Sequence, residues 1–378
     1  MSFWAKLCRS PNIRRRTPAF AFLALLLLAP LYAGKIPCKW SGVEKIVAIA
    51  DIHGDYDNFV KILKGTKLID DKLDWIGGTT HLVQLGDILD RGDQAKEAFD
   101  LLMTLEKQAE EAGGMVHVLI GNHEEANITG LVFDQARYMT YLQLLDFLPK
   151  KYKDKTEREW RKKLGSSYGS DGKIEDEIIR LWKKEITSAN GKIDHDTREA
   201  YTKGFHEKYG KWLLTKNIVI KINESLFVHG CLADNDYYLE RDLETLNNEA
   251  RREFRITADW ATDENRKGFP INPQDLKFLM QPLAPHWYRG WARDPEGRNS
   301  DALTRVLANY KAKHMIIGHT VRGVEYIETQ ELSRFGNRVW AIDIGISWFY
   351  NDLLFALIIK RGEQGNEFIP WWGDDEKE

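Results

Sequence analysis

The sequence predicts an α/β fold with a parallel sheet, and three strand–loop–helix units in its first half support this prediction. Apolar runs at residues 45–50, 82–85 and 115–120 are typical of buried strands, and each run leads into a polar loop. Successive units of this kind form a parallel sheet with their loops at one edge. The chain has 378 residues, of which 43% are apolar and 29% charged, an ordinary globular composition.

The charge distribution argues against binding of nucleic acid. The net charge is −3 at pH 7, and the first 33 residues contain five basic residues and no acidic ones. The rest of the chain is therefore moderately acidic. General nucleic-acid binding needs a basic face, so we expect no nucleic-acid partner.

Residues 1–33 have the layout of a signal peptide or a signal anchor. Three arginines precede a nearly continuous apolar run at 20–29, and Ala33 is a small residue at a possible cleavage site. Pro30 and the short run argue against a complete membrane-spanning helix, which needs about 20 residues. An uncleaved anchor and an organelle-targeting peptide stay open. We expect a protein of the secretory pathway or an exported, periplasmic or extracytoplasmic one, which contacts the membrane only if the segment is an uncleaved anchor.

Residues 34–370 are predicted to form one domain, followed by an acidic tail at 371–378. A helical insertion at about 138–212 interrupts this domain. The insertion is rich in Lys, Glu, Tyr and Trp, and its apolar residues fall at helical spacing. We expect its charges to be solvated helix surface and the insertion to cover one side of the polar loops.

Local patterns predict the individual elements. Phe59, Ile62 and Leu63 indicate a helix after the first strand, and residues 95–111 form an amphipathic helix after the second. A hairpin is expected around the turn at residues 223–224. Later strand-like runs lie at 314–317, 323–329, 338–344 and 353–360.

Five strand-like runs end in Asp, His or Asn beside glycine, and this repetition indicates a site. The residues are Asp51 and His53, Asp87, Asn122 and His123, His229, and His319. A lone polar residue after a strand usually belongs to a turn, but five such ends are hard to explain as turns. Carboxylate, imidazole and amide ligands together suit Mn, Fe, Zn or Co. Two such ions about 3.5–4 Å apart need a bridging anion, and Asp87 is the candidate.

The motifs at these strand ends resemble those of the calcineurin-like metallophosphoesterases. They are D-x-H-G at 51–54, G-D-x-x-D-R-G at 86–92 and G-N-H-E at 121–124, followed by H-G at 229–230 and G-H at 318–319. The intact second motif is similar to the phosphoprotein phosphatase branch. The long insertion and I-D-I-G-I-S at 342–347 look most like the Shewanella-like protein phosphatases.

This resemblance covers residues 45–345 and implies a fold and a metal site. The implied fold has two mixed β-sheets packed as a sandwich and flanked by helices, with the insertion partly roofing the site. The implied site holds two divalent metal ions. Its ligands would be Asp51, His53 and Asp87 for the first ion, and Asp87, Asn122, His229 and His319 for the second.

The resemblance also implies the residues that act on the substrate. His123 would protonate the leaving oxygen as general acid, and Asp90 would orient it. Arg91 would bind the phosphate, because a planar guanidinium matches its oxygens. Arg289 is expected to be a second phosphate-binding and catalytic arginine, or else an arginine stacked on a neighbouring tryptophan.

The implied reaction is hydrolysis of phosphate monoesters by a hydroxide that bridges the two metal ions. The expected substrates are phosphoproteins or phosphopeptides, modified on Ser, Thr or Tyr. A nucleotide or dinucleoside polyphosphate hydrolase shares all the metal motifs and is the alternative. An inactive metal-binding scaffold is disfavoured, because no ligand position is missing and His123 is intact. Val321 replaces the last histidine of the G-H-x-H motif, which disfavours a phosphodiesterase.

Four further residues lie near the motifs. Asp55 is expected to support the site or to lie at a helix N-terminus, and Asp343 and Ser347 to be strand-end residues rather than to line the site. Cys231 is expected to pack as a small buried residue rather than to respond to redox conditions.

Overall fold

The structure is a computed structural model. It describes residues 35–164, 173–186, 193–263, 265–323, 331–363 and 365–373. The predicted signal segment at 1–33 lies outside the described residues, as do all but the first residue of the strand predicted at 323–329 and the last five residues of the tail.

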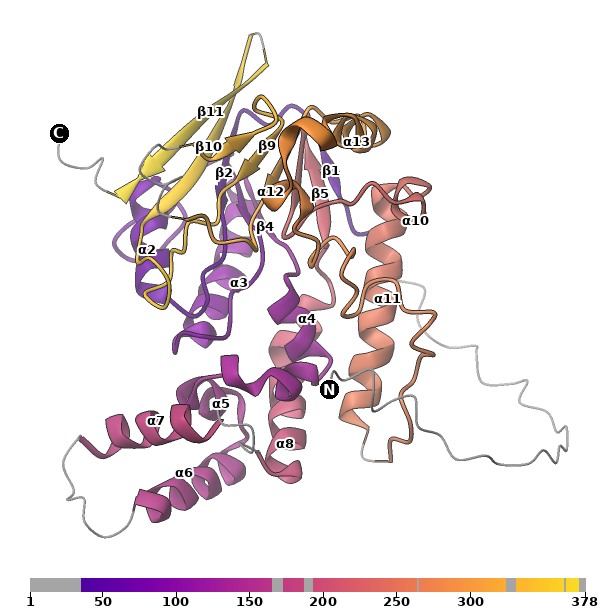
Figure 1. Ribbon diagram of the computed structural model, residues 1–378. Coiled ribbons are helices and arrows are strands. Elements are labelled where there is room, and N and C mark those ends of the chain that lie inside the picture. Colours follow the sequence, from indigo (N-terminus) through magenta and orange to yellow (C-terminus); the bar gives the residue numbers. More distant parts are fainter. Residues whose placement is uncertain are drawn as a thin grey trace, which may run out of the picture. The chain divides into compact units, whose positions relative to one another are not determined.

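Two mixed β-sheets lie at the centre of the domain, as the resemblance implied (Figure 1). One sheet has five strands in the order β11-β10-β2-β3-β4, and the other has six in the order β1-β5-β6-β7-β9-β8. The strands are β1 Lys39–Trp40, β2 Lys45–Ile49, β3 His81–Gln84, β4 Met115–Val118, β5 Val219–Ile222, β6 Ser225–Val228, β7 His314–Ile317, β8 Ser333–Arg334, β9 Val339–Ala341, β10 Phe355–Gly362 and β11 Gly365–Trp372.

Helices flank the sheets and fill the insertion. Those outside the insertion are α2 Tyr56–Gly65, α3 Ala95–Glu111, α4 Asn122–Ile128, α10 Asp236–Leu239, α11 Leu243–Thr262, α12 Gly290–Arg293 and α13 Glu296–Asn309. Within the region predicted as an insertion lie α5 Tyr141–Phe147, α6 Lys150–Leu164, α7 Lys173–Ile186, α8 His195–Phe205, the π-helix η2 His206–Gly210 and α9 Lys211–Leu213. The 3₁₀-helix η1 Leu131–Tyr138 leads into it.

The parallel strands β2, β3 and β4 form the sheet that the sequence predicted. Val47 is paired with Leu82, and Leu82 with Val116, so the three strands run side by side in sequence order. Every residue of β3 is buried, which explains why its sequence lacks an apolar–polar alternation. The loops that follow these strands therefore leave the sheet at one edge.

The C-terminal hairpin corrects the predicted start of the tail. Strand β11 pairs antiparallel with β10 from Gly365 to Trp372, two residues beyond the boundary predicted at 370. The strand escaped prediction because it contains Pro370 and is only half-buried. Proline is tolerated in β11 because the strand lies at the edge of its sheet, where one side needs no ladder hydrogen bond.

The second sheet brings the late histidine motifs together. The predicted hairpin is present, with β5 and β6 antiparallel around Asn223, whose φ of 54° suits a tight turn. Strand β7 runs parallel to β6 and pairs Ile317 with Val228, so His229 and His319 follow neighbouring strand ends. A parallel bridge between residues 119 and 217 connects the chain just after β4 with the chain just before β5.

The insertion has an aromatic core of its own. Phe205 of α8 lies 5.1 Å from Phe147 of α5 between ring centroids, and Tyr201 stacks parallel to Phe205. Its charged residues are largely on the surface, where Lys150 pairs with Asp154. Figure 1 shows helices α5 to α8 grouped together next to α4, which begins at the G-N-H-E motif.

Two general features concern the described residues only. None of the helices in that part of the chain is both long and apolar enough to cross a membrane. Cys38 and Cys231 are both buried and unpaired. Burial raises the pKa of the Cys231 thiol to about 12, which fits a packing role.

Candidate metal centre

The structure brings all six predicted metal ligands into one buried region. None of them is more than 7% exposed: they are Asp51, His53, Asp87, Asn122, His229 and His319. Their side chains arrive from strand ends of both sheets, which explains how motifs up to 268 residues apart meet, as in the hydrogen bond between the His319 N–H and Asp51.

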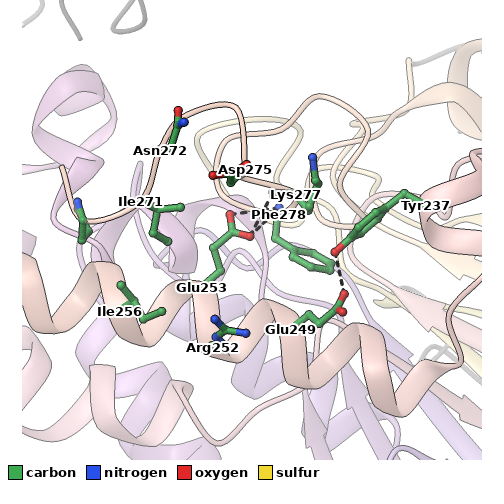
Figure 2. A pocket seen from close by; sticks show the side chains of 11 residues that line it. Tyr237, Glu249, Arg252, Glu253, Ile256, Ile271, Asn272, Asp275, Lys277 and Phe278 are labelled. Atoms are coloured by element: carbon green, nitrogen blue, oxygen red, sulfur yellow. Dashed lines mark hydrogen bonds between the residues drawn. The ribbon is translucent and has the colours of Figure 1, made fainter. Parts of the chain in front are cut away.

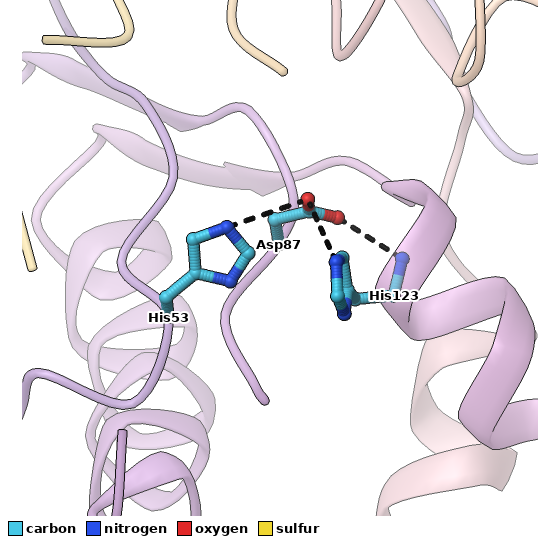
Figure 3. A group of neighbouring side chains, drawn as sticks. All are labelled: His53, Asp87 and His123. Atoms are coloured by element: carbon cyan, nitrogen blue, oxygen red, sulfur yellow. Dashed lines mark hydrogen bonds and ion pairs between the residues drawn. The ribbon is translucent and has the colours of Figure 1, made fainter. Parts of the chain in front are cut away.

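Two groups of ligand atoms share Asp87. The first consists of His53, Asp87 and His123, and Figure 3 shows both rings facing the carboxylate between them. The second consists of Asp87, His229 and His319. Asp87 Oδ2 lies 3.7 Å from His53 Nε2, and Asp87 Oδ1 lies 3.3 Å from His229 Nε2. Each oxygen of Asp87 thus faces one group, which is the arrangement expected of a bridging carboxylate.

Asp51 and Asn122 lie beside these groups. Asp51 Oδ2 is 3.8 Å from His53 Nε2, and its Oδ1 accepts the backbone N–H of His319 at 3.0 Å. Asn122 Oδ1 is 3.3 Å from His229 Nε2. The first group differs from the predicted set of Asp51, His53 and Asp87, because it contains His123 in place of Asp51. His123 Nε2 lies 3.9 Å from Asp87 Oδ2.

Backbone carbonyls fix which ring nitrogen of each histidine can bind a metal. His53 Nδ1 lies 3.1 Å from the carbonyl of Leu89, and His229 Nδ1 lies 2.9 Å from that of Leu85. A carbonyl oxygen can only accept, so both Nδ1 atoms carry the proton and both Nε2 atoms keep a lone pair. Such outer hydrogen bonds orient metal-binding histidines.

The contact between His229 and His319 tests whether a cation fits. His319 Nε2 donates to the carbonyl of Trp287, which leaves a lone pair on its Nδ1. That Nδ1 lies 3.0 Å from His229 Nε2, the atom that also keeps a lone pair when the ring is neutral. Two lone pairs at this distance repel unless a cation, a proton or a metal, lies between them. The donor set therefore fits a divalent metal with nitrogen and oxygen ligands.

The loops that carry the site have an unusual backbone. His53, Asp87, Asp90, Arg91 and His319 all have φ between 47° and 76°, a region that non-glycine residues seldom adopt. Strained residues of this kind cluster at functional sites, where the surrounding structure holds them. A close approach adds to the constraint: a Cβ on the glycine at 121 would lie 2.3 Å from Asp87 Oδ1.

Glu124 locks the second motif to the third, a role that sequence reasoning did not assign. Its carboxylate is fully buried and accepts the backbone N–H groups of Asp87, Ile88 and Gly121 at 2.7–2.9 Å. Burial, together with the nearby charge of Asp87, raises the pKa of Glu124 to about 7. The sequence signal that could have pointed to Glu124 was its position at the end of the G-N-H-E motif.

His123 and Asp90 form the predicted acid pair. His123 Nδ1 lies 2.6 Å from Asp90 Oδ2, and both side chains are buried. Burial alone lowers the pKa of His123, but the charge of Asp87 and the hydrogen bond to Asp90 outweigh it, so this pKa lies above its ordinary value. A raised pKa favours the protonated imidazole, which is the form that a general acid needs.

Three further residues, none of them predicted, hold Asp90 in place. Gln143 of α5 donates to Asp90 Oδ1 at 2.6 Å, and Asn127 of α4 donates to Asp90 Oδ2 at 3.2 Å. Tyr201 of α8 then donates to Asn127 Oδ1 at 2.6 Å. Two of the three belong to the insertion and follow no motif, so only the folded chain reveals them.

Arg91, which is predicted to bind phosphate, lies beside His123. Its Nη2 is 3.2 Å from His123 Nε2, so one substrate oxygen can approach both groups. The guanidinium carbon lies 4.6 Å from the ring centre of Tyr138 and 4.9 Å from that of Tyr350. The two rings fix the guanidinium by cation–π contact.

Arg289 lies next to the second group of ligands. Its guanidinium donates to the carbonyl of His319 and, at 3.1 Å, to the hydroxyl of Thr320. Burial lowers the pKa of its side chain. These contacts place the guanidinium at the His319 loop, which is compatible with the predicted role in binding phosphate.

The remaining predicted residues have structural contacts. Asp55 is the N-cap of α2 and accepts the N–H of Asn58 at 3.0 Å. Asp343 accepts the N–H of Gly345, and Ser347 accepts the N–H of Phe349. The side chains of Asp343 and Ser347 thus shape the loop that follows β9.

A separate hollow lies between α11 and the segment 270–278 (Figure 2). It has a volume of about 460 Å³ and contains none of the predicted site residues. Its buried carboxylate, Glu253, accepts the backbone N–H groups of Lys277, Phe278 and Leu279. Because that carboxylate is used to hold the backbone, we assign the hollow no chemistry.

Comparison with known proteins identifies the family. The sequence model of the Calcineurin-like phosphoesterase family matches residues 44–323. The chain belongs to this family. The protein is therefore a hydrolase of phosphate esters, and its ligand groups are those of a metal-dependent enzyme.

Relatives refine the resemblance that the motifs suggested. Shewanella-like protein phosphatase 2 of Arabidopsis thaliana is 31% identical over 341 residues, which cover 86% of this chain and 77% of that protein. Shewanella-like protein phosphatase 1 of Plasmodium berghei is 26% identical, over 83% of this chain and 69% of that protein. A solved structure of a cold-active protein tyrosine phosphatase is 26% identical with a TM-score of 0.59, covering 89% of this chain and 79% of that one.

Proposed function

We propose that this phosphoesterase is a phosphoprotein phosphatase that acts with two divalent metal ions. The observation that carries the proposal is the position of Asp87, whose two oxygens face two separate groups of histidines. The Asp90–His123 pair and Arg91 lie directly beside the first group. The three relatives described above are named protein phosphatases, which supports phosphoproteins as the substrate class.

The predicted ligands would divide around Asp87. Asp51, His53 and Asp87 would hold one ion, and Asp87, Asn122, His229 and His319 the other. When bound, two divalent ions supply a Lewis acid that activates water and neutralises the phosphate charge. Mn, Fe, Zn and Co are the proposed candidates, because nitrogen and oxygen ligands are mixed and none of the ligands is a cysteine.

The chain's own groups would bind the ester and move the proton. The planar guanidinium of Arg91 would donate two parallel hydrogen bonds to phosphate oxygens. His123 donates its Nε2 proton to the oxygen that leaves, while its Nδ1–H stays hydrogen-bonded to Asp90. Asp90 in turn keeps its position through Gln143 and Asn127.

A substrate panel tests the proposal. We expect turnover of phosphopeptides after addition of Mn, Fe, Co or Zn in turn, and none after chelation. Turnover of dinucleoside polyphosphates tests the alternative function, a nucleotide or dinucleoside polyphosphate hydrolase, because such enzymes use the same metal motifs. Faster turnover of dinucleoside polyphosphates than of any phosphopeptide would contradict the proposal, and metal binding without turnover would favour an inactive scaffold.

We also propose that residues 1–33 direct export or entry into the secretory pathway, with the segment either removed or kept as an anchor. The support is its basic start and its uncharged apolar run. N-terminal sequencing of the protein recovered from its native membranes and soluble fractions would test this. A mature chain that starts near residue 34 indicates cleavage, and an intact chain recovered with neither membranes nor the exported fraction contradicts the proposal.

A further inference from the structure

A small, mostly apolar cavity lies between the insertion and the loop after β9, and its lining also includes Asp93, Thr140 and Lys183. Its volume is about 130 Å³. The insertion contributes Tyr138, Ile179 and Trp182 to its wall, and the loop contributes Trp348 and Phe349. The cavity therefore exists only because the insertion packs near the strand-end loops.

The loop side of the cavity exposes aromatic side chains to solvent. Trp348 is 54% exposed and Phe349 is 42% exposed, although large apolar residues of the described chain are mostly buried. The loop backbone is nevertheless held: the N–H of Trp348 donates to Asp55 Oδ2 at 2.8 Å, and Asn351 donates to the carbonyl of Ile344 at 2.6 Å. Neighbouring exposed aromatic residues on a fixed loop are typical of a binding surface.

Arg91 connects this cavity with the proposed phosphate site. Its guanidinium lines the cavity and also approaches His123 Nε2 at 3.2 Å. The described lining contains neither His123 nor any predicted metal ligand. The leaving oxygen has to reach His123, so that oxygen itself lies outside the cavity. The occupant is therefore another part of the substrate, either the rest of the phosphorylated side chain or a neighbouring side chain.

We propose that the cavity binds an apolar or aromatic side chain of the phosphoprotein substrate, within two positions of the phosphorylated residue. This inference rests on the proposed phosphoprotein phosphatase function. A cavity of about 150 Å³ holds one benzene-sized ring, so 130 Å³ suits a single side chain. An extended peptide advances about 3.3 Å per residue. A substrate residue one or two positions from the phosphorylated residue can therefore reach the cavity beside Arg91.

Phosphopeptides that differ at one flanking position test this inference. Each peptide would carry Ala, Leu, Phe or Glu at one of the two positions on either side of the phosphorylated residue. We expect kcat/KM to be about tenfold higher with Leu or Phe than with Ala at one of these positions, because burial of a large apolar side chain favours binding. Glu there should be the poorest.

Variants of the cavity wall locate the effect. In Trp348→Ala and Ile179→Glu the ratio of kcat/KM for the Phe and Ala peptides should fall towards one. A ratio is used because it is insensitive to partial loss of active protein. Ile76→Ala is the matched control, since Ile76 is 53% exposed and does not line the cavity. Its ratio should equal that of the wild type.

The outcomes separate this inference from the proposed function. Turnover of phosphopeptides with no dependence on flanking residues overturns the subsite and leaves the phosphatase proposal standing. Absence of turnover on every phosphopeptide overturns both. Each peptide is also made with phosphoserine and with phosphotyrosine. A preference for phosphotyrosine that Trp348→Ala abolishes, without any flanking effect, would show that the cavity holds the phosphorylated ring and would overturn the inference.

Discussion

The strand-end loops and the helical insertion contribute to one site in different ways. The loops supply the groups that face the two ligand clusters, such as His53 and Asp87. The insertion supplies Gln143 and Tyr201, which reach the site only through Asp90 and Asn127. The loops are short and strained, whereas the insertion is a packed helical unit with its own aromatic core.

This contrast separates two physical tasks. A ligand must stand within bonding distance of a metal, and the shared edge of neighbouring strands brings such ligands together. A positioning residue needs only a hydrogen bond to a group already in place, so it can come from any segment that packs nearby. Substitutions in the loops should therefore abolish activity, and substitutions in the insertion should tune it.

The largest effect is expected for Asp87→Asn in the loops. Loss of residues that merely support metal ligands costs 10–100-fold, so loss of a ligand shared by two metals should cost about 100-fold or more. Activity on p-nitrophenyl phosphate and bound metal per chain measure it, with circular dichroism to verify the fold. Asp71→Asn is the control, because the side chain of Asp71 is fully exposed. Turnover like that of the wild type in Asp87→Asn would refute the proposed metal centre.

A smaller effect is expected for Tyr201→Phe in the insertion. The change removes the hydroxyl that donates to Asn127, which lies behind Asp90 and His123. We expect kcat to fall about tenfold and the free energy of unfolding to fall by about 1 kcal/mol. The loss should be larger with phosphoserine peptides, whose leaving alkoxide needs an acid, than with p-nitrophenyl phosphate.

This leaving-group dependence distinguishes positioning from simple destabilisation. Tyr209→Phe is the matched control, since Tyr209 also lies in the insertion and donates to Asp100, away from the site. Tyr209→Phe should lower the turnover of phosphoserine peptides and of p-nitrophenyl phosphate equally, or lower neither. An equal loss on both substrates in Tyr201→Phe would mean that the insertion does not act through the acid pair.

The smallest effect is expected in the pH dependence of stability, from a histidine pair that lies outside both the strand-end loops and the insertion. His81 of β3 and His117 of β4 are buried neighbours, 2.9 Å apart between Nδ1 and Nε2, and burial lowers the pKa of each. The folded state thus keeps them neutral where the unfolded chain, with an ordinary pKa of about 6.5, takes up protons. Stability should be fully present above that pH and decline as the pH falls below it, by up to about 1.4 kcal/mol per pH unit for each of the two histidines.

Urea unfolding of the chelated protein between pH 5 and 7.5 measures this slope. His117→Gln should make it shallower, whereas His195→Gln, at an exposed position, should leave it unchanged. Identical slopes for the wild type and His117→Gln would show that the pair does not contribute.

Local patterns predicted the first parallel sheet and many single elements, whereas the two-sheet sandwich was predicted from the family resemblance. Strand β2 and helix α3 begin at the residues that the periodicity indicated, and the parallel order of β2, β3 and β4 followed from their succession. The edge strand β11 was missed, because proline and polar residues in it carry no strand signal. Its partner β10 and the position at the sheet edge decide its conformation.

The site was predictable where chemistry depends on residue type at a strand end. His53, Asp87, His229 and His319 could be named because each follows an apolar run and stands beside glycine. Glu124 was visible in its motif but had no role assigned, since its three backbone partners belong to two motifs. A hydrogen bond to backbone leaves no trace in the partner's sequence.

The sequence by itself determined which residues can bind metal and that they stand at the ends of strands, because hydrophobic periodicity and glycine positions are local properties. Only the tertiary structure decided that Asp87 divides its oxygens between two groups, that Tyr201 supports Asp90 through Asn127, and that Arg91 also lines an aromatic cavity. These facts depend on contacts between segments far apart in the chain. Such contacts arise from packing of the whole domain, which no local pattern encodes.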